Sequence, residues 1–100
     1  MVTEQTVRDT LREVIDPEVG VNIVDLGLVY NVYLGENDVM VEFTVTTALC
    51  PLGSYLTRAV EVHLLALPGV ESVEAHLVYE PPWNPSMMSE EARRALGWVG

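Results

Sequence analysis

The chain has 100 residues, of which 49% are hydrophobic, and its 15 acidic and 5 basic residues give a net charge of −10 at pH 7. This length predicts one domain over residues 1–100, with apolar material for a single core. The acidic balance repels phosphate groups, which excludes binding to nucleic acid and to anionic membrane surfaces. There is also no run of about 20 apolar residues that could span a bilayer.

The compartment is predicted from the cysteine content and the N-terminus. Cys50 is the single cysteine, so no disulfide can form within the chain. The first five residues are polar and acidic, unlike a secretory signal peptide. Together these features predict a cytoplasmic protein.

An apolar stripe predicts a first helix over residues 4–15. Thr3 can cap its start. Asp16-Pro17 should end it, because the residue before a proline avoids the helical region. The stripe consists of Val7, Leu11, Val14 and Ile15.

Residues 16–27 form a long connection that is too apolar for an idle surface loop, so its apolar side chains need something to pack against. A packed loop that carries several polar groups is typical of a functional site. The polar side chains are Asp16, Glu18, Asn22 and Asp25.

Two strands are predicted over residues 28–34 and 39–46. The turn-forming residues 35–38 join them most simply as a hairpin. One face of the sheet should meet helices, and the other should be partly solvated, as in an antiparallel sheet.

A second helix is predicted over residues 51–67, with a broad apolar face and an end at Pro68-Gly69. A third strand follows over residues 72–79, where apolar and polar side chains alternate again. The predicted fold is therefore α+β, with both main helices on one face of a three-stranded sheet in a two-layer domain.

The C-terminal part changes character at Glu80. Three prolines within residues 81–85 exclude regular structure there. A short helix over residues 90–96 follows, capped by Ser89 and ended by Gly97. Side chains of this arm could form a partner surface or could fold back over the sheet or a helix. Those side chains are Trp83, Met87 and Met88, and a partner surface would also include Asn22 from the 16–27 connection.

Cys50 is the strongest candidate for chemistry, because it lies where a strand pattern ends and a helical pattern begins. Unpaired N–H groups at a helix start and the positive end of the helix dipole would favour its thiolate. Thr46 and Thr47 lie just upstream and could hydrogen-bond a thiolate or a bound sulfide. A small buried apolar side chain is the alternative role for this cysteine.

Other kinds of site have little support in the sequence. Phosphate-binding glycine motifs are absent. His63 lies thirteen residues beyond Cys50, about 20 Å along a straight helix, so it cannot serve as a catalytic base for it. His76 is expected on a solvated strand face. One thiolate cannot hold an iron–sulfur cluster, which usually takes four ligands, so a second chain or a partner would have to contribute the others.

Several motifs in order along nearly the whole chain resemble the PaaD-like and SufT-like family. The resemblance implies a small α+β domain that acts in iron–sulfur cluster assembly or in the maturation of iron–sulfur proteins. It implies that Cys50 is the functional thiol, with Asp16 and Thr47 around it. The motifs are Asp16-Pro17-Glu18, Asn22 to Tyr30, Thr46-Thr47, Cys50-Pro51, Leu67 to Val70, Pro81-Pro82-Trp83 and Met87-Met88-Ser89.

The chain also departs from that family. Ala48-Leu49 stands where members often have Pro-Gly, which changes the presentation of the thiol. The cysteine-rich C-terminal segment of larger PaaD proteins and the ATPase domain of some cluster carriers are not in this sequence. A stand-alone SufT-like factor therefore fits better than a full PaaD role.

Three hypotheses follow for the function. The first is a non-enzymatic assembly factor, in which Cys50 transiently ligates iron or a cluster, or docks a client, and no cofactor is tightly bound. Its partners would be iron–sulfur assembly proteins or client apoproteins, and a homodimer could share a cluster. The second is a thiol-dependent transfer enzyme. The third is a non-metal adaptor in the maturation of a phenylacetate-degradation-type oxygenase.

Overall fold

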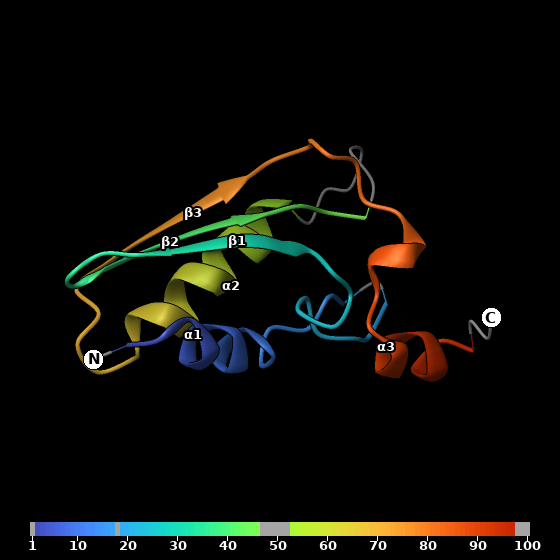
Figure 1. Ribbon diagram of the computed structural model, residues 1–100, viewed down its shortest axis with the longest axis horizontal. Coiled ribbons are helices and arrows are strands. Elements are labelled where there is room, and N and C mark those ends of the chain that lie inside the picture. The colour runs from blue at the N-terminus through green and yellow to red at the C-terminus, as the bar shows by residue number, and fades with distance from the viewer. Residues whose placement is uncertain (1, 18, 47–52, 98–100) are drawn as a thin grey trace.

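The computed structural model describes residues 2–17, 19–46 and 53–97. Its order is α1 (Glu4–Leu11), β1 (Val29–Leu34), β2 (Asp38–Phe43), α2 (Gly53–Leu65) and β3 (Ser72–Leu77), followed by a short 3-10 turn (Pro85–Met87) and α3 (Glu90–Ala95). Figure 1 shows the sheet as one layer, with α1 and α2 packed together on one of its faces. The predicted two-layer α+β fold is therefore confirmed.

The sheet is mixed, with strand order β1-β2-β3. β1 and β2 form the predicted antiparallel hairpin, with Val32 opposite Val41. β3 runs parallel to β2, with Ala75 opposite Val41. The direction of this third strand was not predicted from the sequence. The intervening α2 carries the chain back along the sheet, which is how parallel neighbours are connected.

The first helix is shorter than predicted, since it ends at Leu11 and not at residue 15. Val14 still reaches the core, at 2% exposure, from the turn that follows the helix. Ile15 forms an isolated antiparallel bridge with Asn22 and is 44% exposed. Residues 14–16 pair with residues 21–23 instead, with the Ile23 N–H donating to the Val14 carbonyl and the Asp16 N–H to the Val21 carbonyl, both at 3.0 Å. These tertiary bonds outweigh the helical apolar spacing.

The helix starts follow their predicted caps. Thr3 Oγ1 accepts from the backbone N–H of Thr6 at 3.1 Å, and Ser89 Oγ accepts from that of Ala92 at 3.1 Å. Each cap satisfies one of the N–H groups that a helix start leaves without a partner, which stabilises such a helix by about 1 kcal/mol.

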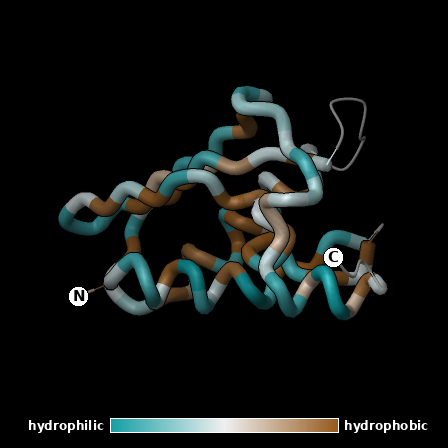
Figure 2. Tube along the Cα trace, turned by 45° about the vertical axis from the view of Figure 1, so that its right-hand side comes forward, coloured by the Kyte–Doolittle hydropathy of each residue, from teal (hydrophilic) through white to brown (hydrophobic). Residues whose placement is uncertain are grey.

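The core lies between the sheet and the two main helices. α2 contributes Leu56, Val60 and Leu64, all fully buried at helical spacing. The inward face of β2 contributes Val39, Val41 and Phe43. Figure 2 shows these hydrophobic stretches meeting in the middle of the molecule, while the hairpin tip is hydrophilic. No helix among the described residues is long and apolar enough to cross a membrane.

Candidate functional site

The connection between α1 and β1 folds as a packed series of turns. The Asp16 carbonyl accepts from the backbone N–H groups of Val19 and Gly20, at 3.2 and 2.7 Å. Ile23 and Leu26 are buried at 0% and 1% exposure. The prediction that these apolar side chains find a packing surface is confirmed. Asp16 itself is 1% exposed, so it lies within this packed segment and not on an open loop.

Asn22 and Asp25 bind each other within the same segment. Asn22 Nδ2 donates to Asp25 Oδ2 at 2.7 Å, and the Asp25 backbone N–H donates to Asn22 Oδ1 at 2.9 Å. Arg12 Nε lies 4.0 Å from Asp25 Oδ1. These contacts fix the shape of the turn, so both side chains already have structural partners in the folded chain.

The C-terminal arm folds back on this turn. Trp83 Nε1 donates to the Leu26 carbonyl at 2.7 Å. The Ser89 backbone N–H donates to the Asp25 carbonyl at 2.7 Å. Met88 is 3% exposed and belongs to the core. Of the two alternatives left open for this arm, Met88 follows the second, because the arm folds back and buries it away from any partner surface.

Gly27 is the point of closest approach between the turn and the arm. Its φ is +78°, and a Cβ built on it would lie 2.2 Å from the Met87 carbonyl oxygen. Only glycine fits such a backbone approach without displacement of the neighbouring chain. The arm and the turn thus form one unit, built from segments that lie about 60 residues apart in the sequence.

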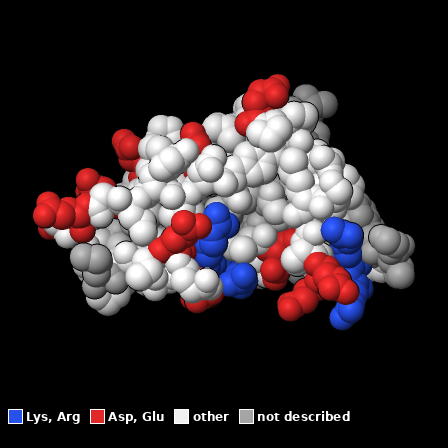
Figure 3. All heavy atoms as spheres, in the orientation of Figure 1, with Lys and Arg blue, Asp and Glu red and all other residues white. Residues whose placement is uncertain are grey.

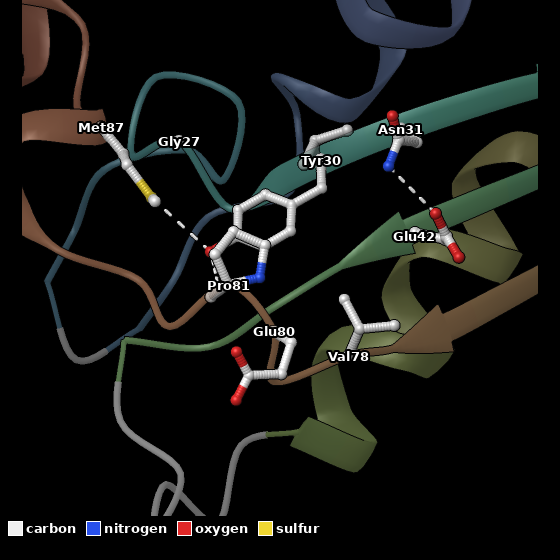
Figure 4. Close-up of a pocket in the computed structure, with 9 residues that line it drawn as sticks. Gly27, Tyr30, Asn31, Glu42, Val78, Glu80, Pro81 and Met87 are labelled. Atoms are coloured by element: carbon white, nitrogen blue, oxygen red, sulfur yellow. Dashed lines mark hydrogen bonds between the residues drawn. The ribbon is translucent and has the colours of Figure 1, made fainter.

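A pocket of about 540 Å³ opens beside this unit, on the sheet face that the helices leave uncovered. Figure 4 shows Tyr30 between the arm and the sheet, with Glu42 and Glu80 on separate walls. The pocket is lined by Gly27, Val29, Tyr30, Asn31, Glu42, Val78, Glu80, Pro81 and Met87.

Tyr30 joins the arm to the sheet inside this pocket. Its hydroxyl donates to the Pro81 carbonyl at 2.7 Å and lies 3.5 Å from Met87 Sδ. Burial raises the pKa of Tyr30 above its ordinary value, and a hydrogen bond with Thr44 lowers it by a smaller amount. The neutral phenol is therefore the form that the folded arm favours.

Glu42 is held by neutral donors on the opposite wall. Its Oε1 accepts from Asn31 Nδ2 at 3.0 Å and from the Tyr33 hydroxyl at 3.2 Å. The carboxylate raises the pKa of the exposed Tyr33, mainly through charge repulsion with the phenolate form. Neither Glu42 nor Glu80 forms a salt bridge with any described residue. This pocket was not predicted from the sequence, although the alternation along residues 39–46 places Glu42 on the opposite face from Val41 and Phe43.

Three of the predicted site residues, Glu18, Thr47 and Cys50, lie outside the described residues. Thr46 is half-buried beyond the end of β2. No group of three or more His, Cys, Asp or Glu side chains within residues 2–17, 19–46 and 53–97 is arranged to hold a metal ion.

The two histidines serve local roles. His63 Nδ1 lies 2.8 Å from the Ala59 carbonyl on α2, ten residues beyond Gly53 and so about 15 Å along the helix from its start. The His76 side chain is 52% exposed on β3, and its Nε2 lies 3.7 Å from Glu74. The expectation of a solvated position for His76 is confirmed.

The comparisons with known proteins agree on one family. Residues 4–77 match the model of the iron–sulfur cluster assembly protein family. The chain is 42% identical over 98 residues to an Fe-S protein maturation auxiliary factor from Porphyromonas gingivalis, covering 97% of this chain and 93% of that protein. It is 42% identical over 85 residues to the Fe-S protein maturation auxiliary factor SufT from Staphylococcus aureus, covering 84% of this chain and 97% of that protein.

A solved structure supports the same assignment. The crystal structure of a domain of unknown function, DUF59, from Bacillus anthracis superposes with a TM-score of 0.91 at 38% identity. The match covers 96% of this chain and 92% of that one. The α+β fold, the sequence match and the relatives together show that the chain belongs to the iron–sulfur cluster assembly protein family.

Proposed function

We propose that this protein is an auxiliary factor for the maturation of iron–sulfur proteins and that it does not act as an enzyme. The observation that carries the proposal is the end-to-end similarity to maturation auxiliary factors, at 42% identity over 97% of this chain. The family match over residues 4–77 includes the segment with Cys50. Its partners would be cluster-bearing assembly proteins and client apoproteins.

Cys50 is the group that we assign to contact the cargo. A thiolate is the protein ligand that iron–sulfur clusters require. In the sequence Cys50 comes three residues before Gly53, where α2 begins, and N–H groups at a helix start favour a thiolate. A single thiolate leaves the other cluster ligands to a partner or to a second copy, so contact with the cluster would be transient.

The described residues on either side of the segment with Cys50 are well packed. Val45 is 5% exposed in the core. Gly53 is buried, and a Cβ on it would lie 2.8 Å from Leu77 Cδ2 on β3. Thr57 Oγ1 donates to the Gly53 carbonyl at 2.8 Å. The described residues on either side of the segment with Cys50 are therefore packed in the fold. We propose that Asp16, Glu18, Asp25, Thr46 and Thr47 support the thiol.

The proposal is tested by cluster transfer under anaerobic conditions. A cluster-loaded scaffold protein is mixed with wild type or with Cys50→Ser. The proteins are then separated by gel filtration, and visible absorbance is recorded as they elute. We expect cluster absorbance to elute with wild type and not with the variant, and the elution volume to show whether two chains share it. A matched circular dichroism melt checks that both proteins are folded.

A second assay measures the function in cells. Activity of a [4Fe–4S] dehydratase is compared in a strain that lacks this protein, with wild type or Cys50→Ser restored. We expect only wild type to restore the activity. Full restoration by folded Cys50→Ser would rule out the thiol role and leave an adaptor. Covalent transfer of an acyl or persulfide group to Cys50, without cluster absorbance, would instead indicate a transfer enzyme.

A further inference from the structure

The arginines of this protein lie on one side of the fold, whereas its acidic residues lie on both. All five basic residues are arginines, and they lie on or next to the helices: Arg8, Arg12, Arg58, Arg93 and Arg94. The uncovered face of the sheet has no arginine or lysine among its described residues. Figure 3 shows the arginines along the α1 and α3 side with acidic residues beside them, and further acidic residues at the hairpin tip and along the opposite edge.

The acidic side chains of the uncovered face follow the strand register. Glu42 on β2 pairs with Asn31 on β1 and with His76 on β3, and Met40 beside it pairs with Glu74. Side chains two residues apart on a strand point to the same face, so Met40 and Glu42 share it. A six-residue strand at about 3.3 Å per residue is roughly 20 Å long. The uncovered face therefore carries Glu42 and Glu74 along this length, and His76 Nε2 lies 3.7 Å from Glu74.

The pocket on the uncovered sheet face can accommodate one side chain of a partner. Tyr30, Val78 and Pro81 supply an aromatic ring and apolar walls, and Glu42 and Glu80 supply carboxylates. A guanidinium combines a planar surface that stacks on aromatic rings with donors that match a carboxylate. The two carboxylates have no salt bridge to any described residue, so neither charge is neutralised within that part of the chain.

We infer that the uncovered sheet face binds an extended, arginine-bearing segment of a partner protein, with one arginine side chain seated in the pocket between Glu42 and Glu80. The pocket volume of about 540 Å³ and its aromatic and apolar lining favour a side chain of a protein segment over a small cation. The apolar walls, together with charge complementarity, favour arginine over a simple polyvalent ion. The inference names a partner for the proposed assembly factor, but its test needs no cluster and no thiol.

The test uses a fluorescein-labelled peptide, Gly-Arg-Ser-Arg-Gly-Arg-Ser, and the same peptide with citrulline at each arginine position. Citrulline keeps the shape of the side chain and removes its charge. Fluorescence anisotropy with wild-type protein should show saturable binding of the arginine peptide and none of the citrulline peptide. Cys50→Ser should bind as wild type does, which separates this result from failure of the proposed function.

Two double variants locate the binding. Glu42→Gln with Glu80→Gln removes both pocket charges, while the amide oxygen at position 42 can still accept from Asn31. Glu13→Gln with Glu91→Gln is the control, because it removes the same charge at exposed positions on the helical side. Since a surface ion pair is weak, we expect the pocket variant to lose about fivefold to tenfold in affinity and the control less than about twofold.

A map of amide chemical shifts on peptide addition gives an independent readout. Shifts at Tyr30, Asn31 and Val78, together with the expected affinities, would support the inference. No binding to wild type would overturn it. Equal losses in the two double variants, or shifts confined to α1 and α3, would also overturn it, because they would indicate attraction to net charge alone.

Discussion

The contact between Gly27 and the arm can be tested with a pair of alanine substitutions. Gly20 and Gly27 have nearly the same left-handed φ, +81° and +78°. A Cβ at Gly20 would meet no atom within 4 Å, whereas at Gly27 it would lie 2.2 Å from the Met87 carbonyl oxygen. Gly20→Ala is therefore a control with the same backbone cost and no collision.

The expected magnitudes follow from these two terms. A left-handed backbone costs a non-glycine residue about 1–2 kcal/mol, so Gly20→Ala should lower the free energy of unfolding by that amount. Gly27→Ala adds an overpacking cost of about 1–3 kcal/mol, because the Met87 backbone must move. Its total loss should be about 2–5 kcal/mol. The free energy of unfolding falls by about 1–3 kcal/mol per molar urea, so the additional loss in Gly27→Ala should lower its unfolding midpoint measurably below that of Gly20→Ala.

Urea unfolding followed by circular dichroism measures both losses, and the indole N–H resonance of Trp83 reports on the arm. We expect that resonance to move in Gly27→Ala, since displacement of the arm lengthens the Trp83 bond to the Leu26 carbonyl. It should stay in place in Gly20→Ala. Equal unfolding midpoints for the two variants, or an unmoved indole resonance in Gly27→Ala, would refute the argument that the arm is locked on this turn.

Three further predictions concern the arm and the pocket. Met88→Ala should lower stability by about 2–4 kcal/mol, because it leaves a cavity in the core, while Met87→Ala at a half-exposed position should cost less than about 1 kcal/mol; equal urea midpoints would contradict this. Trp83→Phe keeps a ring but leaves the Leu26 carbonyl without its donor, so we expect a loss of about 1–2 kcal/mol, and an unchanged midpoint would count against the bond. Because burial raises the pKa of Tyr30 in the folded state, the folded protein holds the phenolic proton more tightly than the unfolded chain. Its contribution is fully present below about pH 10 and is lost as the pH rises further, so urea midpoints above pH 10 should fall more steeply for wild type than for Tyr30→Phe.

The packed connection over residues 16–27 was predicted from the sequence, but the pocket beside it was not. The packed connection, the caps and the hairpin depend on residues close in the chain, so local patterns could predict them. The pocket combines Gly27, Glu42, Glu80 and Met87 from separate segments. Residue spacing in the sequence cannot predict that residues from such distant segments line one pocket. The family resemblance included the residues from Asn22 to Tyr30, but it did not predict a pocket there.

The sequence by itself determined the elements whose causes are local. Thr3 and Ser89 cap their helices through side chains three residues from the N–H groups that they satisfy. The face of α2 follows from apolar residues four apart, which line one side of any helix. The acidic balance, with every basic residue an arginine, is likewise a property of the chain before it folds.

Tertiary structure decided what depends on contacts between distant segments. It ended α1 at Leu11, because the next turn had to place Val14 in the core. It set β3 parallel to β2 and folded the arm so that Trp83 bonds to Leu26, 57 residues away. Burial of Met88 follows from the same fold. These outcomes depend on which surfaces remain to be covered once the sheet and helices have packed, and no local pattern encodes that.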